Sequence, residues 1–157
     1  MERRSDYQTQ SLSPEDIKLL RGMLNLFGEV FDERDTYCHN QPDDSYLHDL
    51  LSKNYFIALV ARQEGRVVGG LAAYELMKFE QQRSEIYIYD LAVSESFRRR
   101  GVATQLINHL QSVAAERGAY VIFVQADYAD DPAIKLYEKL GEKEEVLHFD
   151  ISPEIRS

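Results

Sequence analysis

The sequence predicts one α/β domain in which helices cover both faces of a mixed β-sheet. Segments with the alternation or apolar runs of strands and segments with the three-to-four spacing of helices follow one another in the order β-α-α-β-β-β-α-β-α-β. The 157 residues fit a single domain spanning 1–157. With 44% hydrophobic and 29% charged residues, the chain has the composition of a globular protein with an apolar core.

The first predicted elements are a strand and a long helix. Residues 1–12 are polar with an alternating character, which predicts a strand ending near Leu12. Ser13 can cap a helix, and Pro14 suits its first position. Apolar side chains then recur at steps of three and four as far as Phe31, which predicts one buried helical stripe.

A loop, a short helix and a hairpin follow. Residues 32–45 are polar and rich in Asp, which predicts a loop that either is solvated or covers an acceptor site. Asp43 or Asp44 can start a second helix. Residues 55–61 and 67–77 predict two strands, and the Glu-Gly-Arg turn between them indicates a hairpin.

The second half of the chain alternates strands and helices. Residues 85–93 are apolar on both faces and rich in β-formers, which predicts a central strand. Residues 98–118 predict a helix ended by its last glycine, and 119–126 predict a buried strand. A further helix is expected over 131–141, and a closing strand over 146–151.

Composition and charge exclude several classes of function. Eighteen Lys and Arg against 27 Asp and Glu give a net charge of −9, which argues against nucleic-acid or anionic-lipid binding. The acidity is compatible with a cationic substrate, although such a charge is more often only a solubility feature. The single cysteine, Cys38, excludes an intrachain disulfide and a Cys-based zinc site, and the four histidines lack ligand spacing. No apolar run approaches the ~18 residues of a membrane span, and the N-terminus lacks a signal-peptide core. We therefore expect a cytoplasmic protein without metal, nucleic-acid or membrane partners.

The sequence Arg-Arg-Arg-Gly-Val-Ala at 98–103 follows the predicted central strand and opens a helix. The first N–H groups of a helix lack internal partners and lie at the positive end of its dipole. A glycine and a small alanine let a phosphate approach the backbone, and the arginines add charge. The same residues also fit a solvated basic turn before an ordinary helix.

Two patterns around this turn resemble the GCN5-related N-acetyltransferase (GNAT) family. Its pyrophosphate motif, Gln/Arg-x-x-Gly-x-Gly/Ala, is matched by Arg98, Gly101 and Ala103, and its Leu-x-Val strand end is matched by residues 91–93. The second family signature, Asn-x-x-Ala-x-x-Leu-Tyr-x-x-x-Gly-Phe, is matched over 130–142. The resemblance covers roughly residues 10–151.

The second signature departs at two positions: Asp130 replaces the Asn, and Glu142 replaces the Phe. The resemblance implies acetyl-CoA as co-substrate and a central mixed, mostly antiparallel sheet, splayed at the acetyl-CoA site, with helices on both faces. The cofactor-binding residues that it implies are Leu91, Ala92, Val93, Arg98, Arg99, Arg100, Gly101, Val102, Ala103, Thr104, Asp130, Ala133 and Tyr137.

Four further stretches, 80–93, 119–122, 124–128 and 148–151, resemble the aminoglycoside 3-N-acetyltransferases of the gentamicin-resistance type. This resemblance implies acetyl transfer from acetyl-CoA to the 3-amino group of an aminoglycoside, by direct attack in a ternary complex. It also allows a homodimer. Two rival readings are a GNAT enzyme that acetylates a polyamine or a protein amine, and a non-catalytic acyl-CoA sensor on the same fold.

Asp90 is the candidate base, because an amine attacks a thioester only as the free base and a carboxylate can accept its proton. Asp90 lies in the apolar strand 85–93, where an unpartnered ionised carboxylate is costly; it can also be a strand-end Asp that accepts backbone N–H bonds. Glu85 is a second candidate. The resemblance gives Tyr137 the role of general acid toward the CoA sulfur, whereas its helical spacing equally predicts core packing.

A polycationic sugar calls for carboxylates and tyrosines around the acceptor. The predicted substrate-binding residues are Tyr74, Glu80, Glu85, Asp90, Asp127, Asp130, Asp131 and Asp150. Among these acids, Asp127, Asp130 and Asp131 can each cap the following helix, and Asp131, directly before Pro132, is the expected one. Tyr89 is expected to point away from Asp90 and pack, unless the strand bulges.

Overall fold

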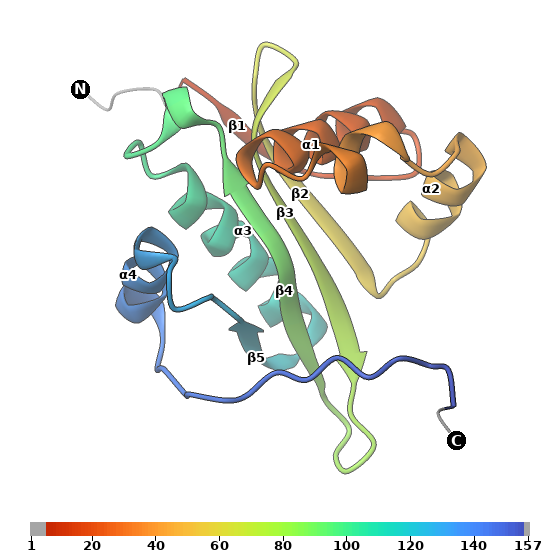
Figure 1. Ribbon diagram of the computed structural model, residues 1–157. Helices are drawn as coiled ribbons and strands as arrows, with labels where there is room; N and C mark the ends of the chain where they lie inside the picture. Colours follow the sequence, from red (N-terminus) through yellow and green to blue (C-terminus); the bar gives the residue numbers. More distant parts are fainter. Residues whose placement is uncertain (1–5, 156–157) are drawn as a thin grey trace. The chain divides into compact units, whose positions relative to one another are not determined.

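The computed structural model describes residues 6–155, which form two compact units: one extends as far as Gln125 and the other starts at Ala126. The first unit holds the whole sheet (Figure 1). The strands are β1 (Gln8–Ser11), β2 (Phe56–Gln63), β3 (Arg66–Met77), β4 (Ser84–Val93) and β5 (Ala119–Val124).

The strands lie in the order β1-β2-β3-β4-β5. Neighbours from β1 to β4 are antiparallel, whereas β4 and β5 are parallel. The predicted mixed, mostly antiparallel sheet is therefore confirmed. The hairpin of β2 and β3 is confirmed too, with Glu64 and Gly65 at positive φ in its turn.

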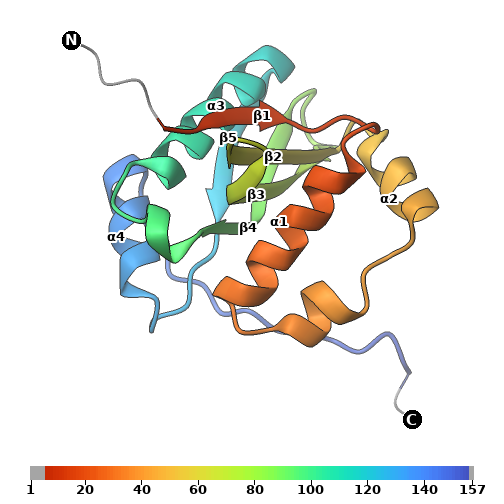
Figure 2. The same ribbon diagram turned by 90° about the horizontal axis from the view of Figure 1, so that it is seen from above.

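Helices cover both faces of this sheet (Figure 2). The first unit contains α1 (Ile17–Val30), the π-helical turn η1 (Asp35–His39), α2 (Asp44–Leu51), the short η2 (Glu95–Phe97) and α3 (Val102–Arg117). The second unit contains α4 (Asp131–Leu140). In Figure 2, α1 and α2 lie on one face of the sheet and α3 lies on the opposite face.

Two adjacent glycines in β3 let α1 and α3 approach the sheet from opposite sides. A Cβ at Gly69 would lie 2.7 Å from the Val102 side chain of α3, and one at Gly70 would lie 2.5 Å from Met23 of α1. Because successive strand residues face opposite sides, one Gly-Gly pair serves both helices. The core on the α1 face includes Met23 and Phe27, each 1% exposed.

The helix predicted from Ser13 begins instead at Ile17. The Ser13 amide donates to Asp16 Oδ2 at 2.8 Å, and the Asp16 amide donates to the Ser13 carbonyl at 2.9 Å. Pro14 therefore lies in a separate turn, and the regular helix starts one turn later. Of the predicted first strand, residues 1–5 lie outside the described residues and β1 begins at Gln8.

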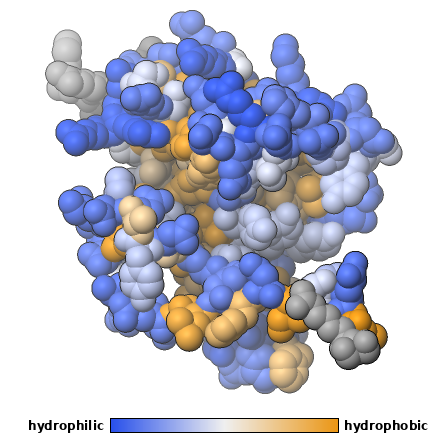
Figure 3. Space-filling view, viewed as in Figure 1, coloured by the Kyte–Doolittle hydropathy of each residue, from blue (hydrophilic) through white to orange (hydrophobic). Residues whose placement is uncertain are grey.

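Two strand predictions near the C-terminus need correction. β5 is not buried, because it is the last strand of the described sheet, and the Tyr120 side chain is 48% exposed. Residues 146–151 form no strand: no described strand pairs with them, and an unpaired strand is not stable. Their apolar side chains are exposed, and Figure 3 shows hydrophobic surface along this segment.

None of the helices between residues 6 and 155 combines the length and the apolar content that a membrane crossing requires.

Candidate active site

A β-bulge in β4 shapes the centre of the site. Ala72 of β3 lies opposite Asp90, and Ala73 lies opposite Ile88, so Tyr89 is one extra residue on β4. A bulge shifts the alternation of side chains by one and bends its strand. Tyr89 is accordingly 60% exposed. The strand bulges at this residue, so Tyr89 does not take the packing role expected for a regular strand.

The parallel ladder between β4 and β5 stops next to this bulge. It runs from Ser84 opposite Ala119 to Ile88 opposite Val124, whereas β4 stays paired with β3 as far as Val93. Residues 89–93 therefore present one edge that pairs with no described strand. An extended amide-containing ligand can bind such an edge by main-chain hydrogen bonds. This is where the family motif puts Leu91, Ala92 and Val93.

Asp90 is half-buried beside the bulge, and the Tyr37 hydroxyl donates a 2.9 Å hydrogen bond to its Oδ2. Burial raises the pKa of the Asp90 carboxyl, the Tyr37 hydrogen bond lowers it, and the negative charge of Glu33 raises it; the net pKa lies above the ordinary 3.8. Raising a carboxyl's pKa toward the working pH makes it a better proton acceptor. The chemistry that this group suits is therefore general-base catalysis.

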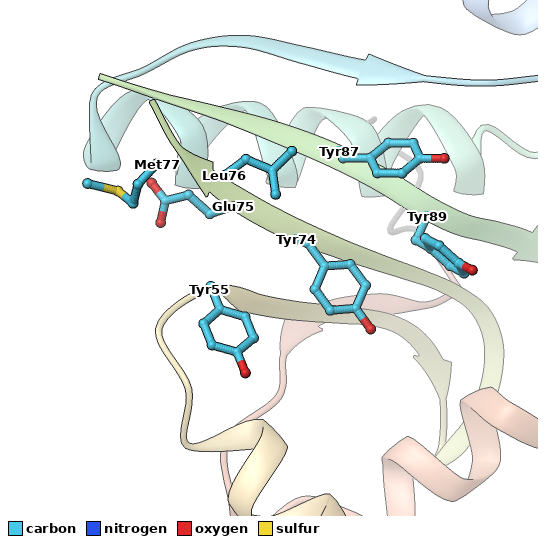
Figure 4. A pocket seen from close by; sticks show the side chains of 7 residues that line it. All are labelled: Tyr55, Tyr74, Glu75, Leu76, Met77, Tyr87 and Tyr89. Carbon is cyan, nitrogen blue, oxygen red and sulfur yellow. The ribbon is translucent and has the colours of Figure 1, made fainter. Parts of the chain in front are cut away.

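An open pocket of about 660 Å³ lies over β3 and β4 and is lined largely by tyrosines (Figure 4). The residues that line it are Tyr55, Tyr74, Glu75, Leu76, Met77, Tyr87 and Tyr89. Tyr74 and Tyr89 meet edge to face with ring centroids 5.8 Å apart, and Tyr87 makes a similar contact with Tyr89. Sequence analysis assigned only Tyr74 to the site, and the structure places it in this wall.

The hydroxyls of Tyr74 and Tyr87 remain neutral over a wide pH range. Burial raises the pKa of Tyr74 and of Tyr87, and the negative charge of Asp90 adds to both effects. Asp90 is therefore within electrostatic reach of the pocket. The wall offers apolar ring faces, phenolic hydroxyls and the Glu75 carboxylate, with Asp90 nearby, a combination that suits a hydroxylated cation.

The predicted acids Glu80 and Glu85 are engaged elsewhere in the first unit. Both form ion pairs with Lys78 around the turn between β3 and β4. Glu75, which sequence analysis did not single out, lines the pocket; it accepts hydrogen bonds from Ser84 at 2.6 Å and from Arg117 at 2.9 Å. Neither Glu80 nor Glu85 lines the tyrosine pocket.

The remaining predicted acids belong to the second unit. Asp130, not the expected Asp131, caps α4, because its Oδ1 accepts a hydrogen bond from the Ala133 amide at 3.3 Å. The Asp127 carbonyl accepts from the Asp130 amide at 3.0 Å, which forms a turn before the helix. Asp150 pairs with His148 at 2.9 Å. The side chains of Asp130 and Asp150 thus also stabilise the local structure around them.

Tyr137 lies on α4 with a hydroxyl that resists ionisation. Burial raises its pKa to about 12, and the charge of Asp130 adds to the rise. The hydroxyl is therefore protonated at neutral pH and available as a hydrogen-bond donor. This state is one that a general acid needs.

Residues 98–104 have the geometry of an anion cradle. Arg99 and Gly101 have φ of 61° and 77°, and Gly101 immediately precedes the 16-residue helix α3. The first intrahelical amide, that of Gln105, donates to the Gly101 carbonyl, so the amides before it are not used by the helix. No atom lies within 4 Å of a Cβ built at Gly101, so the backbone is open to a ligand.

The arginines of the cradle are exposed. Arg100 lies 3.8 Å from Asp6 and packs over the Phe97 ring, and Arg98 and Arg99 flank the turn. Unused helix amides together with three cations fit the pyrophosphate of a CoA molecule. Within residues 6–155, no group of three or more His, Cys, Asp or Glu side chains is arranged to hold a metal ion.

Several site residues gave no usable signal in sequence. Tyr87 and Tyr89 alternate in an apolar strand and resemble ordinary packing residues. Tyr55 stands at the edge of a strand. Tyr37 lies in a polar stretch 53 positions from Asp90, and only the fold brings the two together.

The family model for the acetyltransferase (GNAT) family matches residues 21–141, which is most of the chain. This chain belongs to the GNAT family. The matched region includes the open β4 edge and the turn before α3.

Two solved structures are similar over nearly their whole length. The aminoglycoside acetyltransferase HMB0005 from an uncultured soil metagenomic sample is 57% identical, with a TM-score of 0.92 over 94% of this chain and 99% of that one. The aminoglycoside acetyltransferase meta-AAC0020, also from an uncultured soil metagenomic sample and solved with sisomicin, is 31% identical, with a TM-score of 0.87 over 94% and 97%.

The chain spans less than half the length of the curated relatives that it matches. One of them is the streptothricin acetyltransferase of Streptomyces lavendulae, which is 27% identical over 73 residues. That match covers 46% of this chain and 39% of the relative.

The raised pKa of Asp90 predicts a pH-dependent stability difference. The folded state disfavours the ionised carboxyl, so the penalty is absent below the ordinary value of 3.8 and complete above the folded-state pKa. Asp90→Asn removes the titration and keeps the size. We expect its Tm to exceed that of the parent by up to about 4 °C at pH 7. The gain should shrink toward pH 4 in scanning calorimetry. A variant that is destabilised more at pH 7 than at pH 4 would contradict this.

Proposed function

We propose that this chain transfers the acetyl group of acetyl-CoA to an amino group of an aminoglycoside. The observation that carries the proposal is the half-buried Asp90 with its raised pKa, which lies in the open strand edge next to Tyr89 of the tyrosine pocket. The 57% identity to one aminoglycoside acetyltransferase, and the sisomicin complex of another relative, support the choice of acceptor.

The 3-amino group of a gentamicin-type aminoglycoside is the acceptor position that we propose. Its support is the resemblance over residues 80–93, 119–122, 124–128 and 148–151. In the structure, 80–93 includes the bulge, Asp90 and two of the pocket tyrosines. One of the four stretches that resemble the 3-N-acetyltransferases thus contains the candidate base and part of the pocket wall.

The co-substrate binds in two places that the first unit provides. Backbone amides and arginines of residues 98–104 hold the pyrophosphate, and the free edge of Leu91, Ala92 and Val93 holds the pantetheine arm. We also assign the family contacts of Asp130 and Ala133 to the co-substrate. Acetyl-CoA supplies a thioester carbonyl as the acetyl donor.

The reaction is a direct attack within a ternary complex. Asp90 accepts a proton from the substrate ammonium, directly or through water, and the free amine attacks the thioester carbonyl. A carbon–nitrogen bond forms and the carbon–sulfur bond breaks. Tyr137 donates its proton to the departing thiolate. The attacking nitrogen loses its second proton to water, and Tyr137 recovers a proton from the same solvent. These proton transfers end in neutral thiol and amide products.

The acceptor is held by ring faces and by charge. Tyr74, Tyr87 and Tyr89 offer faces to the sugar rings, and Asp90 binds the ammonium that reacts. The remaining acids, which we propose attract the other ammonium groups of the acceptor, are Glu80, Glu85, Asp127, Asp130, Asp131 and Asp150. Glu80 and Glu85 are already paired with Lys78, so their share of this attraction is small. The exposed acids accelerate encounter more than they strengthen binding.

The function is tested by thiol release from acetyl-CoA with gentamicin, kanamycin, spermidine, a peptide amine or no acceptor. We expect turnover with gentamicin and a product acetylated at the 3-amino group by NMR. Preference for spermidine or the peptide would assign another amine substrate. Binding of acetyl-CoA without turnover on any acceptor would make the protein a sensor.

The phosphate cradle predicts that Gly101→Asp abolishes acetyl-CoA binding. The carboxylate would repel the pyrophosphate and block its approach to the backbone amides. Gly118→Asp is the matched control, because Gly118 has a similar φ of 72° and equally open surroundings at the other end of α3. Calorimetry should show binding only for the control, with circular dichroism showing both folded. Equal affinities in the two variants would remove residues 98–104 from the site.

The role of Tyr137 predicts a kinetic defect without a folding defect. Tyr137→Phe keeps the ring and removes the proton that the thiolate accepts. Turnover should fall roughly 10–10⁴-fold, with water substituting in part, while Tm stays close to that of the parent. A large loss of Tm with normal turnover per folded molecule would show instead that Tyr137 only packs.

A further inference from the structure

The stretch between α1 and α2 is not a simple solvated loop. Its π-helical turn η1 (Asp35–His39) lies directly on α1, where a Cβ at Gly28 would be only 2.3 Å from Cys38 Sγ and 3.3 Å from Tyr37 Cβ. The Glu33 amide donates to the Gly28 carbonyl at 2.9 Å. The missing side chain at Gly28 therefore lets the turn dock on the helix.

The ring of Tyr37 is held from two sides. Its centroid lies 5.9 Å from that of Phe27 and 5.7 Å from that of Phe31, and both of these rings belong to the α1 segment. Gln41 donates to the Tyr37 carbonyl at 3.0 Å, which fixes the backbone of the turn. A ring packed in this way can direct its hydroxyl to one place with little loss of rotamer freedom.

That place is Oδ2 of Asp90, 2.9 Å from the hydroxyl oxygen. Glu33, beside the turn, acts electrostatically on both residues, and Tyr89 acts on Tyr37. Asp90 acts in turn on Tyr74 and Tyr87 of the sheet. All of these are acids or phenols. Among residues 6–155, no Lys or Arg forms an ion pair with Asp90, so the Tyr37 hydroxyl is the group that stabilises its charge.

We propose that Tyr37 is a positioning residue for Asp90: its hydroxyl holds one carboxylate oxygen, which directs the other to the acceptor amine and sets the pH above which Asp90 can act. This inference rests on the proposed function, in which Asp90 receives the proton. The docking of η1 on Gly28 thereby becomes part of the catalytic apparatus.

The sign of the effect follows from the donor. A hydrogen bond to the ionised carboxylate favours that form, so its loss raises the pKa of Asp90 further. In Tyr37→Phe the acid limb of the kcat/KM profile should move up by about one pH unit. The rate should fall roughly tenfold on that limb and recover to within about threefold above the new midpoint. A purely structural role would lower the rate at all pH values equally.

The matched control is Tyr46→Phe, which makes the same chemical change on the exposed side of α2, outside the pocket lining. Its acid limb should coincide with that of the parent. Tyr37→Phe with an unmoved acid limb would overturn the proposal.

A second readout does not need activity. The Asp90 carboxyl carbon, assigned by its absence in Asp90→Asn, is titrated by ¹³C NMR in the parent and in Tyr37→Phe. Its midpoint should rise in the variant. If the parent acetylates no acceptor, the proposed function fails, but this titration still tests the effect of the Tyr37 hydroxyl on Asp90. An Asp90 midpoint that does not move in Tyr37→Phe would refute that effect whatever the substrate.

A third variant covers a folding failure of Tyr37→Phe. Incorporation of 3-fluorotyrosine at position 37 keeps the ring packing and makes the hydroxyl a stronger donor. The Asp90 midpoint should then fall below that of the parent. A midpoint that rises or stays unchanged would overturn the proposal.

Discussion

One extra residue in β4 determines where the candidate site of the first unit lies. The bulge at Tyr89 coincides with the end of the β4–β5 ladder, so the sheet opens where the residue after the bulge is a carboxylate. The same bulge exposes the Tyr89 ring to the pocket wall formed with Tyr74 and Tyr87. An open strand edge, a candidate base and an aromatic wall thus have one common origin in the backbone.

The surroundings of Asp90 favour function over stability. A half-buried carboxylate beside Glu33 and several phenols is stabilised by one hydroxyl, that of Tyr37, and burial leaves its pKa raised. Local conflicts of this kind persist where a reaction requires them. In the rest of the first unit the local sequence and the packing agree. Gly69 and Gly70 let two helices approach the sheet, and α1 and α3 bury their apolar stripes against it.

The parts of the fold that depend on local sequence were predictable. Gly101 and Gly118 mark the two ends of α3, and Asp43, one of the two expected starts, caps α2. Where two local signals compete, prediction failed: Ser13 and Asp16 form a turn before α1, and Asp130 rather than Asp131 caps α4. The strand expected over 146–151 depends on a partner strand, which a local pattern does not supply.

The site was predicted only in part for a similar reason. The motif residues 91–93 and 98–104 are contiguous, and Asp90 is conspicuous as a charge in an apolar strand. The alternation of side chains in a strand sequence does not reveal a bulge, because a bulge is defined only by the pairing register with the neighbouring strand. The Tyr37–Asp90 contact joins residues 53 positions apart, and Glu80 and Glu85 are paired with Lys78 by a turn whose geometry the sequence does not state.

The most direct test of this account is the kinetics of Asp90→Asn with gentamicin between pH 6 and 8, measured together with acetyl-CoA affinity by calorimetry. The amide keeps the size of the side chain and cannot accept the proton. The account predicts a fall of at least ~10²-fold in turnover, a typical general-base contribution, with acetyl-CoA affinity nearly unchanged. Turnover equal to that of the parent across this range would contradict it, because Asp90 would then be neither the base nor the anchor of the amine.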